Sequence, residues 1–230
     1  MKGKKTRFVK FRRAVLFSSI FLSITLALTA FAAVAEKETL KVPIVASPKG
    51  AQGWKLKEWK GKADFEVVEA EASTAFHLKS VSTSTALYKE VKFDIRDYPF
   101  LNWSWKAVEL PAGGDVRKKS ADDQAAQVYV VFPRWPAPVN SRIIGYIWDT
   151  TVPAGVSIQS TKSSYTKYIV VRGGNGDLNK WLTEKRDVYQ DYKRLFKEDP
   201  PKVGSVSVMI DSDDTKTSAE SFVGNIFFSK

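Results

Sequence analysis

Alternate acidic residues follow one apolar segment and have the chemistry of a hard-metal site. Asp211 and Asp213 come directly after a predicted buried strand, and carboxylates spaced in this way are oxygen ligands suited to Ca²⁺. The run begins like an EF-hand loop, but Lys216 replaces the required glycine and Phe222 replaces the bidentate acid. We therefore expect no cofactor and favour a polar turn whose Asp side chains cap backbone amides, with a Ca²⁺ site as the alternative.

A second acidic pair, Asp122 and Asp123, precedes another predicted strand. Two carboxylates hydrolyse a glycoside when they face each other across the substrate, about 5–10 Å apart. Neighbours in a strand point to opposite faces, so this pair needs a partner from elsewhere in the fold. The acids available for that pairing are Asp191, Asp211 and Asp213. The simpler interpretation is an ion pair with Arg186 or a cap at the strand edge.

Arg186 and Asp191 belong to the segment Arg186-Asp187-Val188-Tyr189-Gln190-Asp191-Tyr192. We predict that Arg186 is a buried guanidinium that reaches Asp122 or Asp123. The functional interpretation is that Arg186 and these acids contact an anion or the hydroxyls of a sugar. The structural interpretation, an internal ion pair, is favoured.

Aromatic residues are numerous for a chain of 230 residues, with seven Trp among them. Trp and Tyr combine an apolar ring with a polar atom, which suits them to stacking on sugar rings. Trp103 and Trp105 share one face of a predicted strand and belong to the core. We predict that Trp135, held in a proline-rich loop, is exposed, and that Tyr146 and Trp148 also contact a ligand.

The composition excludes several classes of chemistry. The chain has no cysteine, so it has no disulfide, thiolate metal site or cysteine nucleophile. His77 is the only histidine, which excludes a multi-histidine zinc site and leaves His77 as the one candidate base for a serine triad. The sequence also lacks a phosphate-binding glycine loop and a nucleophile elbow.

The elements that must position these residues are mostly strands. Short runs that alternate between apolar and polar residues recur between Gly, Pro, Asp and Ser clusters, which predicts half-buried antiparallel sheet. The predicted strands are 64–70, 75–81, 85–93, 100–108, 124–132, 142–149, 167–172, 204–211 and 222–229. Strands of this number and length predict a two-sheet sandwich of jelly-roll type. Apolar residues at three- and four-residue spacing predict one amphipathic helix near 178–197.

The first 35 residues have the pattern of a secretory signal peptide. Seven basic residues precede the apolar stretch 14–32, and small residues end it at Ala35. Without those seven, 29 Lys and Arg face 25 Asp and Glu, a net charge of +4, which is no footprint for nucleic acid. We expect a signal peptide over 1–35, an extended lead-in over 36–60 and one sandwich domain over 61–230. The mature protein would be periplasmic or extracellular, with an uncleaved membrane anchor as the alternative.

Taken together, five motifs resemble domain of unknown function family 3047, a group of uncharacterised exported bacterial proteins. The motifs begin at Asn102, Asp122, Tyr146, Arg186 and Asp211, and the resemblance covers roughly Trp54 to Lys230. In similar proteins asparagine usually follows the arginine of the helix motif, whereas this chain has Asp187. The resemblance implies a β-sandwich similar to carbohydrate-binding jelly rolls, and it brings no established activity.

Three functions are compatible with these residues. The first is a non-catalytic module that binds a glycan or another component of the cell envelope, without nucleic acid and without a membrane once the signal is removed. Its predicted ligand contacts are Trp135, Tyr146, Trp148, Asp122, Asp123, Arg186 and Asp191. The second is an enzyme that acts on envelope saccharides through a carboxylate pair. The third is a structural or protein-interaction domain in which the polar residues only stabilise the fold.

Overall fold

A computed structural model describes residues 38–47, 50–70 and 74–230. Leu40–Lys230 forms one compact unit. The predicted signal peptide, residues 1–35, lies outside the described residues. Among the residues that are described, no helix is long and apolar enough to cross a membrane.

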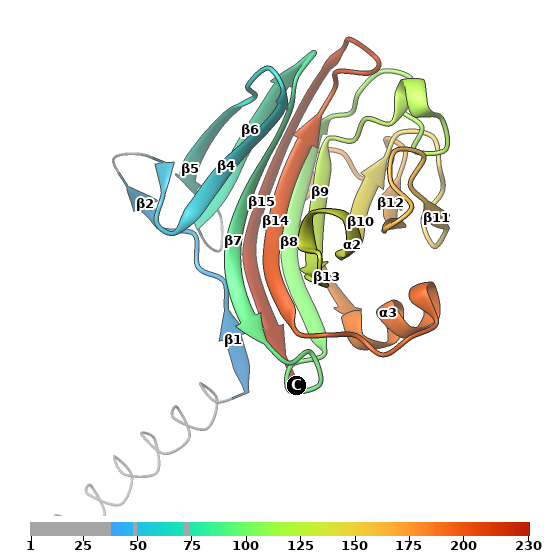
Figure 1. The fold of residues 1–230 in the computed structure, drawn as a ribbon. Helices are drawn as coiled ribbons and strands as arrows, with labels where there is room; N and C mark the ends of the chain where they lie inside the picture. Colours follow the sequence, from blue (N-terminus) through green and yellow to red (C-terminus); the bar gives the residue numbers. More distant parts are fainter. Residues whose placement is uncertain (1–37, 48–49, 71–73) are drawn as a thin grey trace, which may run out of the picture. The chain divides into compact units, whose positions relative to one another are not determined.

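The compact unit is built on two β-sheets (Figure 1). The first sheet has the order β13-β8-β15-β6-β5, all antiparallel, and β1 also pairs with β15. Its strands are β1 (Thr39–Lys41), β5 (Asp64–Glu69), β6 (Thr74–Val81), β8 (Phe100–Glu109), β13 (Leu182–Asp187) and β15 (Ser218–Ser229).

The second sheet has seven strands in the order β11-β12-β10-β9-β14-β7-β4. Its neighbours are antiparallel, except for the parallel pair β10 and β12. The strands are β4 (Trp54–Lys60), β7 (Ser84–Phe93), β9 (Ala126–Phe132), β10 (Arg142–Asp149), β11 (Ser157–Gln159), β12 (Thr166–Gly173) and β14 (Val203–Asp211). Short elements complete the fold: the pair β2 (Ala46–Ser47) and β3 (Gly50–Ala51), the 3₁₀ turn η1 (Lys119–Ala121), and the helices α2 (Ala137–Asn140) and α3 (Val188–Phe196).

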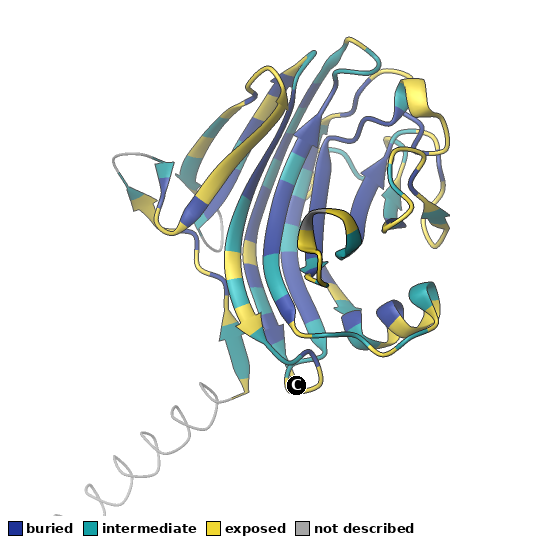
Figure 2. Ribbon diagram, viewed as in Figure 1, coloured by how far each residue is buried: buried dark blue, intermediate teal, exposed yellow. Residues whose placement is uncertain are grey.

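The main core lies between the two large sheets, and Figure 2 shows buried residues along their central strands. Trp103 and Trp105 of β8 are fully buried, and their rings pack edge to face with centroids 5.3 Å apart. Val206 and Val208 of β14 meet the same core from the opposite sheet. The predicted antiparallel two-sheet sandwich is therefore confirmed, and each of the nine predicted strands is present within a few residues of its predicted bounds.

The described part of the lead-in predicted over 36–60 contributes to the sandwich instead. Val42 and Trp54 are core residues, and residues 54–60 form β4, which pairs with β7 at the edge of the seven-stranded sheet. The Trp54 ring packs edge to face on Phe76, with centroids 4.9 Å apart. The lysine-rich sequence of β4 did not predict a strand. Both faces of an edge strand are open enough to carry charged side chains, so β4 needs no apolar face.

The helix predicted over 178–197 is wrong in its first half. Helix α3 begins only at Val188, and residues 182–187 form β13, an edge strand beside β8. The inward residue of β13 is the carboxylate Glu184, which accepts hydrogen bonds from Trp105 Nε1 at 3.1 Å and Arg172 Nε at 2.7 Å. A strand that buries an acid has no apolar alternation, so its sequence predicts no strand.

The start of α3 has a clear local cause. Asp187 is the N-cap, and its carboxylate accepts a hydrogen bond from the Gln190 backbone N–H at 2.9 Å. Short polar side chains at this position satisfy an N–H group that has no partner within the helix. Asparagine, the residue usual at this position in similar proteins, has an oxygen that can cap in the same way.

Candidate functional site

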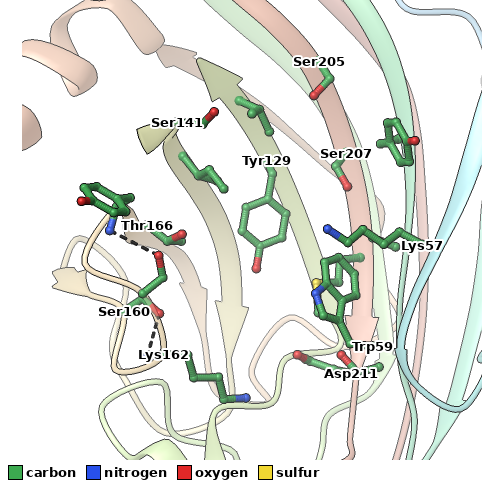
Figure 3. A pocket seen from close by; sticks show the side chains of 18 of the residues that line it. Lys57, Trp59, Tyr129, Ser141, Ser160, Lys162, Thr166, Ser205, Ser207 and Asp211 are labelled. Carbon is green, nitrogen blue, oxygen red and sulfur yellow. Dashed lines mark hydrogen bonds between the residues drawn. The ribbon is translucent and has the colours of Figure 1, made fainter. Parts of the chain in front are cut away.

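A groove of about 910 Å³ lies on the outer face of the seven-stranded sheet, the face turned away from the main core (Figure 3). Its floor is made by β7, β9, β10, β12 and β14, and one wall is made by the edge strand β4. The segments 137–141 and 160–166 form the rest of the rim. Pockets of this size hold small ligands or several units of a chain.

Strand alternation decides which residues of the sheet face the groove. On β14, Val206 and Val208 point into the core, whereas Ser205, Ser207 and Met209 line the groove. The sequence pattern predicted this division for the valines and serines, because successive side chains of a strand point to opposite faces.

The wall of the groove carries the exposed aromatic residue Trp59, whose side chain points into the cavity in Figure 3. Trp59 is 54% exposed. Glu58 pairs with Thr85 and Lys60 pairs with Ser84, so Trp59 is the extra residue of a β-bulge. A β-bulge changes the direction in which a side chain points, and bulges are frequent next to binding sites. The Lys57 ammonium lies 4.9 Å from the centroid of the Trp59 ring, a cation–π contact that orients the indole.

Two tyrosines lie side by side on the floor. Tyr129 of β9 and Tyr168 of β12 flank Gly145 of β10 in register, and their ring centroids are 6.3 Å apart. A Cβ atom on Gly145 would lie 2.6 Å from Tyr129 Cε1 and 2.8 Å from Tyr168 Cδ1. Glycine is required here because only a residue without a side chain lets both rings lie over the sheet.

Carboxylates collect at one end of the groove. Asp122 and Asp211 both line it and are 2% and 4% exposed. Gln124 links them: its backbone N–H donates to Asp211 Oδ1 at 2.7 Å, and its side-chain Nε2 donates to Asp122 Oδ1 at 3.1 Å. Gln127 Nε2 also donates to Asp211 Oδ1 at 2.7 Å. The two acids are therefore held in fixed orientations.

Asp122 keeps one oxygen free. Its Oδ2 atom is buried and has no hydrogen-bond partner among the described residues, and the nearest ammonium, Lys162 Nζ, is 4.0 Å away. Burial raises the pKa of Asp122 to about 6, and the neighbouring Asp214 and Asp123 act in the same direction. A buried acceptor without a donor is costly, so this oxygen is an unsatisfied position at the acidic end of the groove.

Asp123, the neighbour of Asp122, is fully buried and has a different set of contacts. Its carboxylate accepts hydrogen bonds from the Asp214 and Thr215 backbone N–H groups at 3.2 and 2.6 Å, and from Thr215 Oγ1 at 2.6 Å. The backbone of the turn after β14 is thus tied to the residue before β9. Asp123 acts as the predicted polar cap rather than as a direct lining residue.

Two aromatic residues predicted to contact a ligand lie in the core instead. Tyr146 and Trp148 of β10 are 0% and 1% exposed, and they alternate with Gly145 and Ile147 on the opposite face. The Tyr146 ring lies 5.4 Å from that of Trp103, so a ligand has no access to it. The direction in which β10 presents its two faces depends on sheet packing and was not set by its sequence alone.

Arg186 and Asp191 pair with each other, which corrects the predicted partner of Arg186. The Arg186 Nη2 atom donates to Asp191 Oδ1 at 2.8 Å, and neither Asp122 nor Asp123 contacts it. The Tyr146 hydroxyl donates to Asp191 Oδ2 at 3.1 Å. None of these three residues lines the groove, and the favoured interpretation, an internal ion pair, describes their contacts.

Trp135 is 89% exposed, as its loop predicted, but it is not among the lining residues of the groove. The groove is made largely by residues that the sequence did not single out, chiefly Trp59, Tyr129, Tyr168 and Lys162. The alternation of Lys57 and Trp59 was the available signal for the wall. Of the predicted ligand and metal residues, the structure brings Asp122, Asp211 and Asp213 together in the groove.

Comparison with solved structures finds similar sandwiches at low identity. The family 11 carbohydrate-binding module of Lic26A-Cel5E from Clostridium thermocellum is 10% identical, with a TM-score of 0.44 over 81% of this chain and 93% of that chain. The family 30 module of Cel9D-Cel44B from the same organism is 10% identical, with a TM-score of 0.44 over 77% and 91%. The xyloglucanase domain of NopAA from Sinorhizobium fredii is 11% identical, with a TM-score of 0.43 over 77% and 93%. At this distance the likenesses carry no argument about ligand or activity.

No curated protein sequence matches the chain. A family model described as "Protein of unknown function (DUF3047)" matches residues 51–227.

Proposed function

We propose that this chain, which belongs to the DUF3047 family of proteins of unknown function, binds a glycan in the groove of its seven-stranded sheet. The observation that carries the proposal is the exposed indole of Trp59, which a β-bulge places on the wall of a groove whose floor combines aromatic rings with hydroxyl groups. Sugars present apolar C–H faces and a ring of hydroxyls. A site for them therefore needs an aromatic plane beside hydrogen-bonding groups.

Side chains on the floor and wall supply those groups. Ser205 and Ser207 offer hydroxyls that donate or accept hydrogen bonds, and the Lys57 ammonium on the wall is a further donor. Tyr165, on the rim, is 38% exposed and offers a second aromatic surface in the same groove. This combination supports binding of an oligosaccharide rather than of an apolar ligand.

A second candidate function, glycoside hydrolysis, is favoured by one observation. Burial raises the pKa of Asp122 to about 6, a value that suits a general acid, and Asp211 and Asp213 line the same groove. In this alternative Asp122 protonates the leaving oxygen and a second carboxylate acts on the opposite side of the sugar. Release of reducing ends that is lost in Asp122→Asn, while the glycan still binds, would favour the enzyme.

We also propose that the protein acts outside the cytoplasm. A domain that binds envelope glycans acts outside the cytoplasm, and the basic head and apolar stretch of residues 1–35 support export. Intact mass measurement of the protein recovered from the periplasm or the medium tests this, because cleavage removes the residues up to about Ala35.

The test of glycan binding uses two exposed tryptophans that differ in position. Purified protein is titrated by calorimetry with cellohexaose, laminarihexaose, xylohexaose, chitohexaose and a polygalacturonate oligomer. We expect saturable binding of one class, and a loss of about five- to thirtyfold in affinity for Trp59→Ala, because stacking on an indole contributes on the order of 1–2 kcal/mol.

Trp135→Ala is the matched control. Trp135 is more exposed than Trp59 but does not line the groove, so its removal should leave the affinity unchanged. The opposite result, loss with Trp135→Ala and none with Trp59→Ala, would move the site to the proline-rich loop. Binding of none of the five glycans would refute the proposal and favour a protein-interaction domain.

A further inference from the structure

Three carboxylates converge at the acidic end of the groove. One oxygen from each of Asp123, Asp211 and Asp213 lies within 4.8 Å of the other two. Strands β9 and β14 are antiparallel neighbours, so the residues that lead into β9 and the residues at the end of β14 meet at the same end of the two strands.

Hydrogen bonds fix two of these carboxylates and leave lone pairs available. Asp211 Oδ1 accepts from Gln124 and Gln127, and Asp123 accepts from the turn at Thr215, as described above. The Asp213 carboxylate is held less firmly, since its Oδ2 atom lies 3.7 Å from Lys60 Nζ. A carboxylate oxygen accepts two bonds, so each acid keeps capacity for a cation.

Asp122 supplies an independent observation. Its Oδ2 atom is buried and has no hydrogen-bond partner among the described residues, and Gln124 ties its other oxygen to the same side chain that holds Asp211. A buried carboxylate oxygen without a hydrogen bond is unfavourable unless a cation binds it. Lys162 Nζ, the nearest cation, lies 4.0 Å from this oxygen, beyond hydrogen-bond distance, and is hydrogen-bonded to Asp214.

The balance of charge also favours a cation. Five carboxylates lie at this end of the groove, on Asp122, Asp123, Asp211, Asp213 and Asp214, and the ammonium groups paired with them are those of Lys60 and Lys162. Like charges in a poorly solvated site repel each other unless a cation neutralises them.

We propose that Asp123, Asp211 and Asp213 bind a divalent cation, with Ca²⁺ as the best fit, at the end of the groove that Asp122 also lines. Ca²⁺ takes six to eight oxygen ligands at about 2.3–2.6 Å, so the ligands of one ion lie within about 5 Å of each other. The 4.8 Å limit of the cluster meets that condition. The ligand set contains oxygen only, which suits Ca²⁺ better than Zn²⁺.

The site would stabilise the acidic end of the groove without depending on any glycan. Bound Ca²⁺ would hold the turn after β14 against the residues before β9 and would bring Asp122 into a neutralised environment. Failure of Ca²⁺ binding and failure of glycan binding are separate results, because each ligand is titrated alone.

The experiment measures Ca²⁺ binding to chelator-treated protein by calorimetry, and the melting temperature with and without Ca²⁺. We expect one saturable site and a rise in melting temperature, since a ligand that binds only the folded state stabilises it. Asp213→Asn should weaken Ca²⁺ binding at least tenfold while leaving the metal-free melting temperature unchanged or higher. Asp213 is partly exposed and its removal relieves repulsion, so this variant should fold.

Asp177→Asn is the matched control, because Asp177 is paired with Lys180 and lies outside the cluster. It should bind Ca²⁺ like the natural chain. Absence of heat and of any thermal shift at roughly 5 mM Ca²⁺, above the range of weak extracellular sites, would overturn the proposal. Equal weakening by both variants would show nonspecific charge screening and would also overturn it.

Discussion

Replacing Asp191 with alanine tests whether the helix motif stabilises the fold or binds a ligand. The Asp191 carboxylate is 5% exposed and accepts hydrogen bonds from three side chains. The donors are Arg186 Nη2 at 2.8 Å, Arg194 Nη2 at 3.1 Å and the Tyr146 hydroxyl at 3.1 Å. Asp191→Ala removes all of these bonds and leaves the groove residues in place.

The expected loss follows from the exposure of each donor. The Tyr146 hydroxyl is fully buried, and leaving it without an acceptor costs about 2 kcal/mol. The Arg186 and Arg194 side chains are 35% and 49% exposed, so water solvates them and each pair contributes only about 0.5 kcal/mol. The free energy of unfolding should therefore fall by about 3 kcal/mol, which lowers the melting temperature by about 9 °C in a domain of this size.

The assay is urea unfolding of the natural chain, Asp191→Ala, Tyr146→Phe and the double variant. Tyr146→Phe removes the hydroxyl that Asp191→Ala leaves unpaired, so the double variant should lose at least 1 kcal/mol less than the sum of the two single losses. Glycan affinity measured below the unfolding transition should stay unchanged, because neither residue lines the groove.

A different pattern would refute this reasoning. If Asp191→Ala unfolds at the same urea concentration as the natural chain but no longer binds glycan, then Arg186 and Asp191 form the ligand site that their sequence motif suggested. Strict additivity of the two losses would show that the hydroxyl and the carboxylate do not interact.

Two further predictions concern the groove and the loop that leads to it. Gly145→Ala should lower the free energy of unfolding by about 1–3 kcal/mol and weaken glycan binding, because the added methyl group displaces the Tyr129 and Tyr168 rings. Urea unfolding measures the first effect and calorimetry the second. An unchanged affinity would exclude the two tyrosines from the binding site. Asp115, on the loop before η1, accepts two hydrogen bonds from the Arg117 guanidinium, which hold the pKa of this carboxyl well below its usual value near 3.8. A lowered folded-state pKa stabilises the protein above the unfolded-state pKa and ceases to do so as the pH falls through the folded-state value. We therefore expect the natural chain to exceed Asp115→Asn in unfolding free energy by a constant amount from pH 7 to about pH 5, and by a smaller amount below about pH 4. A difference that grows on acidification would contradict this expectation.

The strands were predictable because burial on one face imposes a visible pattern. Val206, Val208 and their serine neighbours alternate, and so do Leu101, Trp103 and Trp105, so a period of two marks a half-buried strand without knowledge of its partners. Strand β13 breaks this rule because its inward residue, Glu184, is acidic and pairs with Arg172 on another strand.

The groove was less predictable than the sheet. Alternation separates the two faces of β10 but does not say that Gly145 faces the ligand side and Tyr146 faces the core. That choice is made by packing against the other sheet. The free oxygen of Asp122 is likewise a property of contacts far apart in sequence, since Asp211 and Gln124, 87 residues apart, join across two strands.

The bulged strand that carries Trp59 also makes the groove wall adjustable. Strand β4 is an edge strand, so β7 is the one strand that it pairs with in its sheet, and six of its seven residues are exposed. Segments with few buried contacts and solvent-exposed amides open locally at low free energy. The wall can therefore move outward while the floor, built on central strands, stays fixed, and amide protons of β4 should exchange faster than those of β9 until a bound glycan slows them. With a glycan bound as proposed, the rigid floor would set the register of the sugar chain and the movable aromatic wall would set how wide a chain the groove admits.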